Sequence, residues 1–139
     1  MNAVDTNVWV YSIDTHEPAK RQKALELLGG LSQGAVPTVL LFQVAGEYLS
    51  CLRKWEGQGR LARHEVEGHL NHALALFSLV IPGDQLFSVS LGLSSRYSLS
   101  HWDSMLLAAC IDAGVDTLYS EDLGDGTRYD TVLVVNPFA

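Results

Sequence analysis

Short apolar runs alternate along this chain with longer segments in which apolar residues recur every three or four positions. The short runs predict five buried strands: "NAV" (2–4), "AVPTV" (35–39), "LVI" (79–81), "DTLYS" (116–120) and "TVLVV" (131–135). The longer segments predict helices over "PAKRQKALELLGG" (Pro18 in its first turn, Gly29–Gly30 as its stop), "LFQVAGEYLSCLRKW", "RHEVEGHLNHALALF", "QLFSVSLGLSSRY" and "SHWDSMLLAACIDAG".

The order of these elements predicts the fold class. Strands that alternate with helices and are apolar throughout favour an α/β fold with a parallel sheet covered on both faces. With 139 residues, 47% of them hydrophobic, and no repeat or linker, the sequence predicts one domain over residues 1–139. In such folds the functional crevice lies at the carboxyl ends of the strands.

Composition excludes several protein classes. No apolar run approaches the roughly 18 residues that a membrane-spanning helix needs, and no secretory signal pattern opens the chain. We therefore expect no membrane association. Cys51 and Cys110 both fall in apolar, helix-like segments, so two free thiols in a reducing cytoplasm are expected rather than a disulfide.

Charge is unevenly distributed along the chain. The net charge is −7, but residues 1–63 carry seven Lys/Arg against six Asp/Glu, whereas residues 64–139 carry two against ten. A purely electrostatic nucleic-acid binder would be more basic. A polyanionic substrate would have to meet metal ions or the basic residues, unless those residues only form solvated helix faces. The basic clusters are Lys20, Arg21, Lys23 and Arg53, Lys54, Arg60, Arg63.

Four acidic residues follow predicted strands or open the helices after them. Asp5 ends the first strand, with no basic residue within nine positions, and Glu47 lies in the helix after the second strand. Asp103 lies in the first turn of the helix that begins near Ser100, and Asp122 follows the "TLYS" strand. A parallel sheet would bring these four positions to one edge.

Each acid also has a purely structural interpretation. Asp5 fits the cap of a helix over "NVWVYS", and Glu47 fits a solvated helix residue. Ser100 and Asp103 have the spacing of a capping box, and Asp122 fits a turn in a Gly/Asp-rich loop. A shared site explains all four positions together, and capping does not exclude metal binding.

A shared site would need a cation. Two carboxylates about 5 Å apart repel each other by roughly 3 kcal/mol at an effective dielectric constant near 20. Three or four would retain protons near neutral pH unless a cation were bound. Carboxylate oxygens suit Mg²⁺ or Mn²⁺, whereas zinc prefers His and Cys ligands. We therefore interpret Asp5 as a metal ligand.

These residues also resemble a known family. "AVDTNVWVYS", Glu47, "WDSMLLAAC" and "TLYSEDLGDG" together resemble the PIN domain, and more narrowly the VapC-type ribonuclease toxins that pair with VapB-type antitoxins. The resemblance spans residues 3 to about 137. It implies a three-layer α/β/α sandwich with a mainly parallel central sheet, and a Mg²⁺- or Mn²⁺-dependent endoribonuclease.

The resemblance also assigns roles to residues. Asp5, Glu47, Asp103 and Asp122 match the family's catalytic, metal-binding acids, although Glu121 and Asp125 crowd the fourth position. We expect Asp5 and Asp103 to bind metal directly, Glu47 to bind metal or orient a water, and Asp122 to complete a second site or act through water. Hydrogen-bonding support is expected from Thr6, Asn7 and Ser120.

Hydrolysis by such a site would leave a 5′-phosphate and a 3′-hydroxyl. The resemblance implies an RNA substrate, a cognate VapB-like antitoxin and a homodimer. It identifies neither the RNA that is cut nor the number of metal ions.

Other chemistries have weaker support in the sequence. His64, His69 and His72 share a predicted helix without further ligands for a transition metal, and His101 is expected to be a packed or exposed loop residue. Nucleophile and Walker motifs are missing. A haloacid-dehalogenase-type phosphatase would need a second Asp where Asn7 stands. A non-catalytic RNA- or protein-binding module with the same fold is the other alternative.

Overall fold

A mainly parallel sheet forms the centre of the protein, whose computed structural model describes residues 1–139. The six strands lie in the order β3-β2-β1-β4-β6-β5, and all neighbours are parallel except the antiparallel pair β5–β6. The strands are β1 (Asn2–Val4), β2 (Thr38–Leu41), β3 (Ser78–Val80), β4 (Thr117–Tyr119), β5 (Arg128–Tyr129) and β6 (Val132–Val135).

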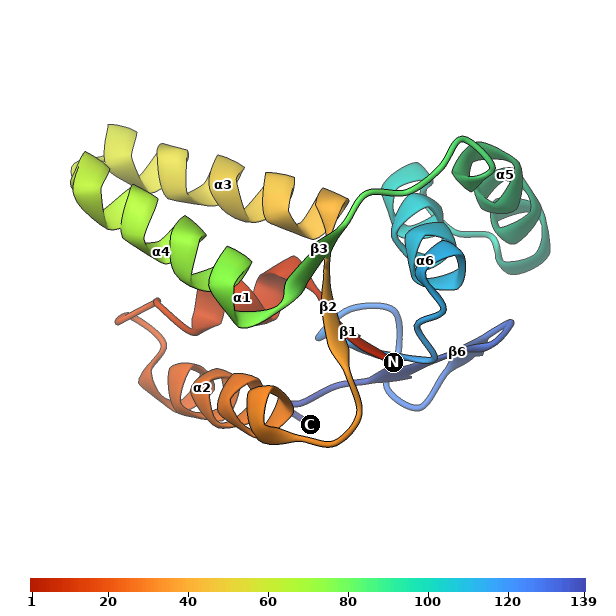
Figure 1. Ribbon diagram of the computed structural model, residues 1–139, viewed down its shortest axis with the longest axis horizontal. Helices are drawn as coiled ribbons and strands as arrows, with labels where there is room; N and C mark the ends of the chain where they lie inside the picture. The colour runs from red at the N-terminus through yellow and green to blue at the C-terminus, as the bar shows by residue number, and fades with distance from the viewer.

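Six helices flank this sheet. They are α1 (Thr6–Tyr11), α2 (Pro18–Gln33), α3 (Phe42–Gly57), α4 (Arg63–Leu76), α5 (Leu86–Tyr97) and α6 (His101–Ala113). The strands lie between a group formed by α1–α4 and the pair α5–α6 (Figure 1). This arrangement confirms the predicted α/β class with a mainly parallel central sheet.

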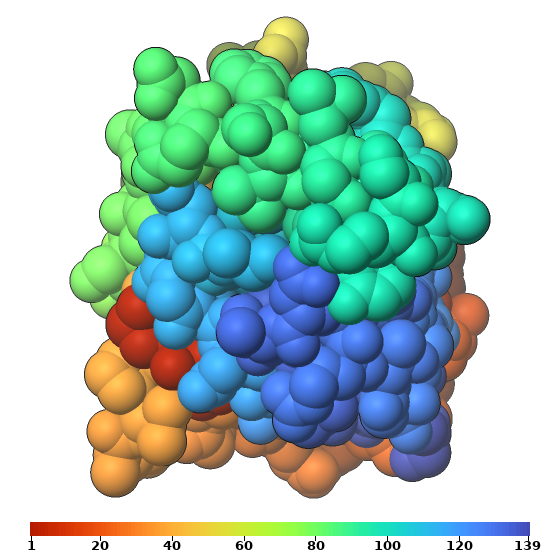
Figure 2. Space-filling view, turned by 90° about the vertical axis from the view of Figure 1, so that its right-hand side faces the viewer, coloured from red at the N-terminus to blue at the C-terminus, as the bar shows by residue number.

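Burial is greatest where the sheet meets the helices. Every residue of β1 and β2 is buried, and α6 buries an unbroken run from Ser104 to Cys110. The outer layer is more exposed: α5 spreads over the upper part of the face in Figure 2, above the C-terminal strands, and leaves Phe87 and Leu91 largely in solvent. None of the helices combines the length and apolarity that a bilayer crossing requires.

The element boundaries correct parts of the sequence prediction. The predicted stop at Gly29–Gly30 is wrong, because α2 continues to Gln33 and neither glycine takes the left-handed conformation that ends a helix. Strand β2 begins at Thr38 rather than at position 35, because Pro37 has no N–H to donate to the sheet. Helix α1 was anticipated only through the capping alternative for Asp5, and β5 was not predicted. Both cysteines are free, as expected.

Candidate active site

Asp5 lies where β1 ends and α1 begins. The register that pairs Val4 with Tyr119 continues one position further, so Asp5 lies beside Ser120, and the Asp5 N–H donates to the Tyr119 carbonyl at 2.8 Å. One carboxylate oxygen accepts from the Thr6 N–H at 2.7 Å, which caps α1, and the other accepts from Ser120 Oγ at 2.7 Å. The capping interpretation of Asp5 is therefore correct, and it coexists with a position at the sheet edge.

Glu47 reaches the same edge from α3. Its helix begins directly after β2 and buries its Val44 and Tyr48 face, which leaves the Glu47 side chain exposed. Its Oε1 accepts from Thr6 Oγ1 at 2.9 Å, so the residue that follows Asp5 also positions Glu47. One turn earlier, Gln43 Nε2 donates to the Trp102 carbonyl at 3.2 Å and ties the start of α3 to the start of α6.

Asp103 lies in the first turn of α6. Ser100 caps this helix, with its Oγ accepting from the Asp103 N–H at 3.2 Å, but the carboxylate makes no hydrogen bond back to the cap. Only half of the predicted capping box is therefore formed. The half-buried carboxylate has no partner within the protein and is free to act in the space that it lines.

Asp122 comes from the loop after β4. Its N–H donates to Ser120 Oγ at 3.0 Å, and its Oδ2 accepts from Asn7 Nδ2 at 3.2 Å. Asp125, the competing fourth acid, instead accepts from the Asn136 N–H at 2.8 Å and does not line the same space. The geometry thus brings Asp122, not Asp125, to the other three acids.

These segments enclose one acidic cleft of about 140 Å³. It is lined by Asp5, Thr6, Asn7, Gln43, Glu47, Trp102, Asp103, Leu106 and Asp122. All four predicted acids line it, together with Thr6 and Asn7, while Ser120 is buried and reaches it through its hydrogen bonds. Sequence reasoning missed Gln43, Trp102 and Leu106. Two of these carried a signal: Gln43 precedes Glu47 by one helical turn, and Trp102 adjoins Asp103.

The cleft is electrostatically unbalanced. None of its four acids pairs with a Lys or Arg. Burial raises the pKa of Asp5 to about 6; the hydrogen bonds from Ser120 and Thr6 oppose this rise, and the charges of Glu47 and Asp122 add to it. A bound cation would relieve this repulsion.

The donor set of the cleft fits a hard cation. Carboxylate oxygens are the ligands that Mg²⁺ and Mn²⁺ prefer, and no sulfur or imidazole ligand lines the space. The acids are not drawn together into a finished coordination shell, since no three such groups lie close enough to hold an ion as they stand. Thr6 holds Glu47 and Asn7 holds Asp122 by neutral hydrogen bonds instead. The cleft therefore suits a hard cation in the type and the location of its ligands.

A second acidic group lies beside the cleft but is neutralised. Lys20 of α2 donates to Glu121 Oε1, and Tyr11 of α1 donates to Glu121 Oε2 at 2.7 Å. The Lys20 ammonium also lies 4.6 Å from the centre of the Tyr11 ring. Partial burial acts to raise the pKa of Glu121, but the bonds from Lys20 and Tyr11 outweigh it and hold the pKa below its usual value.

Other basic side chains divide into paired and unpaired ones. Arg60 pairs with Asp14 at 3.3 Å, and Arg63 pairs with Glu56 at 2.8 Å. Four members of the two basic clusters have no acidic partner: Arg21, Lys23, Arg53 and Lys54. Within the two clusters, these four are the side chains left to meet a polyanion, and Arg128 of β5 is also unpaired.

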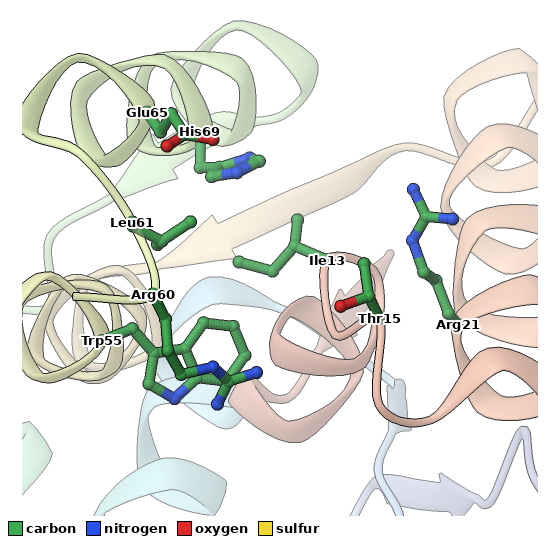
Figure 3. Close-up of a pocket in the computed structure, with 8 residues that line it drawn as sticks. All are labelled: Ile13, Thr15, Arg21, Trp55, Arg60, Leu61, Glu65 and His69. Atoms are coloured by element: carbon green, nitrogen blue, oxygen red, sulfur yellow. The ribbon is translucent and has the colours of Figure 1, made fainter. Parts of the chain in front are cut away.

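A larger hollow lies between α2 and α4, away from the acidic cleft. Two adjoining spaces of about 290 and 490 Å³ share three lining residues, which are Ile13, Arg21 and His69. Figure 3 shows Arg60 against the Trp55 ring, with Arg21 facing Glu65 and His69 across the space. Burial lowers the pKa of His69. His69 and His72 line this hollow and do not form a metal site.

Comparisons with known proteins agree with this geometry. A family model described as the PIN domain matches residues 3–124. A toxin–antitoxin complex from Klebsiella pneumoniae has a similar chain, with a TM-score of 0.70 and 18% identity over 99% of this chain and 98% of that one. VapBC2 from Rickettsia felis, bound to a promoter DNA fragment, has a TM-score of 0.69 and 15% identity over 96% of each chain.

A third similar structure is VapC20 of Mycobacterium tuberculosis, a toxin that cleaves the sarcin–ricin loop. It gives a TM-score of 0.66 and 16% identity over 88% of this chain and 90% of that one. No curated protein matches the chain significantly. At these identities the three structures establish a shared fold.

Proposed function

Because this chain belongs to the PIN-domain family, we propose that it is a divalent-metal-dependent endoribonuclease, the toxin of a VapBC-type pair. One observation carries the proposal. Four carboxylates from four separate segments line one cleft at the carboxyl edge of the sheet, and no basic residue neutralises any of them. Family membership also leaves the phosphatase alternative, which already lacked its second Asp at Asn7, without support.

The reaction would be hydrolysis of an RNA phosphodiester bond. A bound Mg²⁺ or Mn²⁺ would supply positive charge to the scissile phosphate and acidify a coordinated water. Asp5 and Asp103 would hold the ion directly, Glu47 would hold it or orient the attacking water, and Asp122 would complete a second position or act through water. The attacking water would lose a proton as its oxygen bonded to phosphorus, the bond to the 3′-oxygen would break, and this oxygen would take up a proton, so the products would be a 5′-phosphate and a 3′-hydroxyl.

Three neutral residues would support these acids. Ser120 donates to Asp5, Thr6 to Glu47 and Asn7 to Asp122, so each bond fixes one carboxylate in orientation while leaving it charged. A positively charged partner in their place would compete with the metal. We also propose that residues 1–139 form one domain, because all the acids and their supporting residues surround the same sheet.

The protein partner would be a VapB-like antitoxin. The toxin–antitoxin complexes with this fold support it, as does the hollow between α2 and α4. Trp9 is one of the residues that line this hollow, and its buried Nε1 has no hydrogen-bond partner within the protein. A homodimer is proposed through the exposed apolar side chains of α5, Phe87 and Leu91.

The test is cleavage of RNA by the purified chain, free of any antitoxin. A fluorescent RNA is incubated with the wild type and with Asp5→Asn, in EDTA, in Mg²⁺ and in Mn²⁺. We expect cleavage only with metal and only by the wild type, with 5′-phosphate ends on the products. Asp125→Asn is the matched control, because this acid belongs to the same loop but lies outside the cleft.

The non-catalytic alternative makes the opposite prediction. If no RNA from a total-RNA preparation is cut in any metal, and Mn²⁺ binds the wild type no more tightly than Asp5→Asn, the acidic cleft is not an active site. Cleavage that persists in EDTA would likewise contradict the proposed metal dependence.

A further inference from the structure

Trp102 is exposed in a way that the other two tryptophans are not. Its exposed fraction is 62%, against 2% for Trp9 and 8% for Trp55. An indole buries more apolar surface than most side chains, so leaving it in water forgoes a large stabilisation. A tryptophan held in solvent at the rim of a cleft is therefore a candidate contact for a ligand.

The surroundings of Trp102 fix its position. It lies in the first turn of α6, and its carbonyl accepts the bond from Gln43 of α3, so its backbone is tied to both walls of the cleft. The His101 ring meets the indole edge-on, with the ring centres 4.6 Å apart. The indole lines the cleft beside Asp103, and its exposed surface forms part of the rim.

Positive charge lies beyond Glu47 along α3. Arg53 and Lys54 are exposed and have no acidic partner, and with Gly46 and Ser50 they line a shallow groove on the outer face of the helix. Gly46 adjoins Glu47, and Arg53 lies about 10 Å further along the helix at 1.5 Å per residue. The cleft therefore has an aromatic surface on α6 and unpaired cations on α3.

We propose that Trp102 is a base-stacking platform: a nucleobase next to the scissile phosphate lies on its indole, and the adjoining phosphates follow Arg53 and Lys54. This inference rests on the proposed ribonuclease function and adds the way in which its substrate is held. Every base has a flat face, so stacking on an aromatic side chain holds single-stranded RNA with little dependence on sequence. A paired duplex hides those faces, so the substrate is single-stranded at the cut.

The test uses fluorescence, because Trp102 is the only exposed tryptophan. The full chain is titrated in Ca²⁺, an oxygen-preferring cation, with a pool of random RNA octamers and with an abasic octamer of equal charge. A gel checks that the RNA stays intact. We expect the RNA to quench tryptophan emission and to bind about tenfold or more tightly than the abasic chain, whereas the abasic chain leaves the emission unchanged.

Variants distinguish stacking on the indole from the effect of side-chain size and from the effect of the basic residues. Trp102→Leu should abolish the preference for the base-bearing chain, and Trp102→Phe should keep most of it. Ile81→Ala, at an exposed apolar position that does not line the cleft, should not change it. Arg53→Gln should weaken both octamers alike. Thermal melts confirm that each variant folds, as expected for exposed positions.

Several results overturn the inference. The stacking role would be wrong if Trp102→Leu still preferred the base-bearing RNA, or if RNA bound the wild type without quenching its emission. Neither result would affect the nuclease proposal, which is tested separately by the cleavage assay. Emission that changes with protein concentration alone would assign Trp102 to contact with a second copy. Wild type that neither binds nor cleaves RNA would end both proposals.

Discussion

Glu121 and Asp122 are adjacent in the chain, yet they lie in opposite electrostatic environments. Glu121 accepts from Lys20 and Tyr11, which anchor it to α2 and α1. Asp122 turns into the cleft and accepts only from the neutral amide of Asn7. One acid is neutralised by the fold, and its neighbour is left charged beside three others.

The difference shows that the negative charge of the cleft is not caused by a shortage of cations. A lysine reaches the loop that carries Asp122, but it binds the acid that lies outside the cleft. Carboxylates held by neutral donors repel each other and gain most from an added metal ion. Unpaired carboxylates gathered in one cleft, rather than an acidic composition of the chain, therefore mark the candidate active site.

Replacing each of the two neighbours should give the largest contrast. Asp122→Asn should lower cleavage by about 10²–10³-fold, because it removes a preorganised charge from the cleft. Glu121→Gln should cause a much smaller loss. Initial rates in saturating Mg²⁺ measure both, and equal losses would show that the whole loop, rather than the cleft-facing acid, is needed.

The pH dependence of stability should differ between the two environments. In EDTA, the Asp5 pKa of about 6 exceeds its unfolded value of 3.8, so its ionised form destabilises the fold by about 3 kcal/mol above pH 6. This penalty is relieved as the pH falls from about 6 towards 4. Urea unfolding of wild type and Asp5→Asn at pH 7.5 and pH 5 measures it.

The free-energy difference between these two proteins should shift in favour of the wild type at the lower pH. The comparison cancels other titrating groups, because both proteins share them. A difference that does not change with pH would show that Asp5 ionises as easily in the folded chain as in the unfolded one.

Ser120 tests the support beneath the cleft. Ser120→Ala removes the donor to Asp5 and the acceptor for the Asp122 N–H, so Mn²⁺ affinity should fall by about 10–100-fold. The pKa of Asp5 should rise further, because the lost bond favours the charged form. Calorimetric Mn²⁺ titrations at two pH values measure both effects. Ser32→Ala, at an exposed hydroxyl of α2, is the matched control.

The smallest effect is expected at Lys20. Lys20→Met should lower stability at pH 7, because it removes the bond that depresses the pKa of Glu121. That contribution is present above the unfolded pKa of Glu121, near 4.5, and is lost as the pH falls through the lower pKa of the folded state. Urea unfolding should therefore show a larger deficit at pH 7 than at pH 3, and Lys20→Arg should restore most of the stability.

Much of the fold followed from local patterns because the central strands and helices are strongly apolar. Strand β1 is buried throughout, β4 and β6 are apolar runs that are partly buried, and α6 has both a cap at Ser100 and a stop at Gly114. The two-residue β5 is partly exposed and exists only through its pairing with β6, so no local pattern marks it. The end of α2 was missed because Gly29 and Gly30, which are exposed, remain helical and do not stop the helix.

The site was predictable where the topology alone positions residues. Asp5 and Asp122 follow neighbouring parallel strands, so their approach follows from the strand order. The resemblance indicated Asp122 as the fourth acid, but the local pattern alone does not separate it from Glu121, because the position of Glu121 depends on Lys20, about a hundred residues away in sequence. The role of Trp102 depends on its exposure, which the sequence of an apolar helix does not reveal.

The positions of the four acids along the chain also determine when the cleft can form during synthesis. The acids come from segments that begin with residue 5 and end with residue 122, and Ser120 is held in turn by its N–H bond to the Val135 carbonyl of β6. No partial chain that lacks β6 can complete this arrangement. During synthesis the cleft therefore forms only after β6 has left the ribosome, so a nascent chain that stops before β6 carries the acids without the finished cleft.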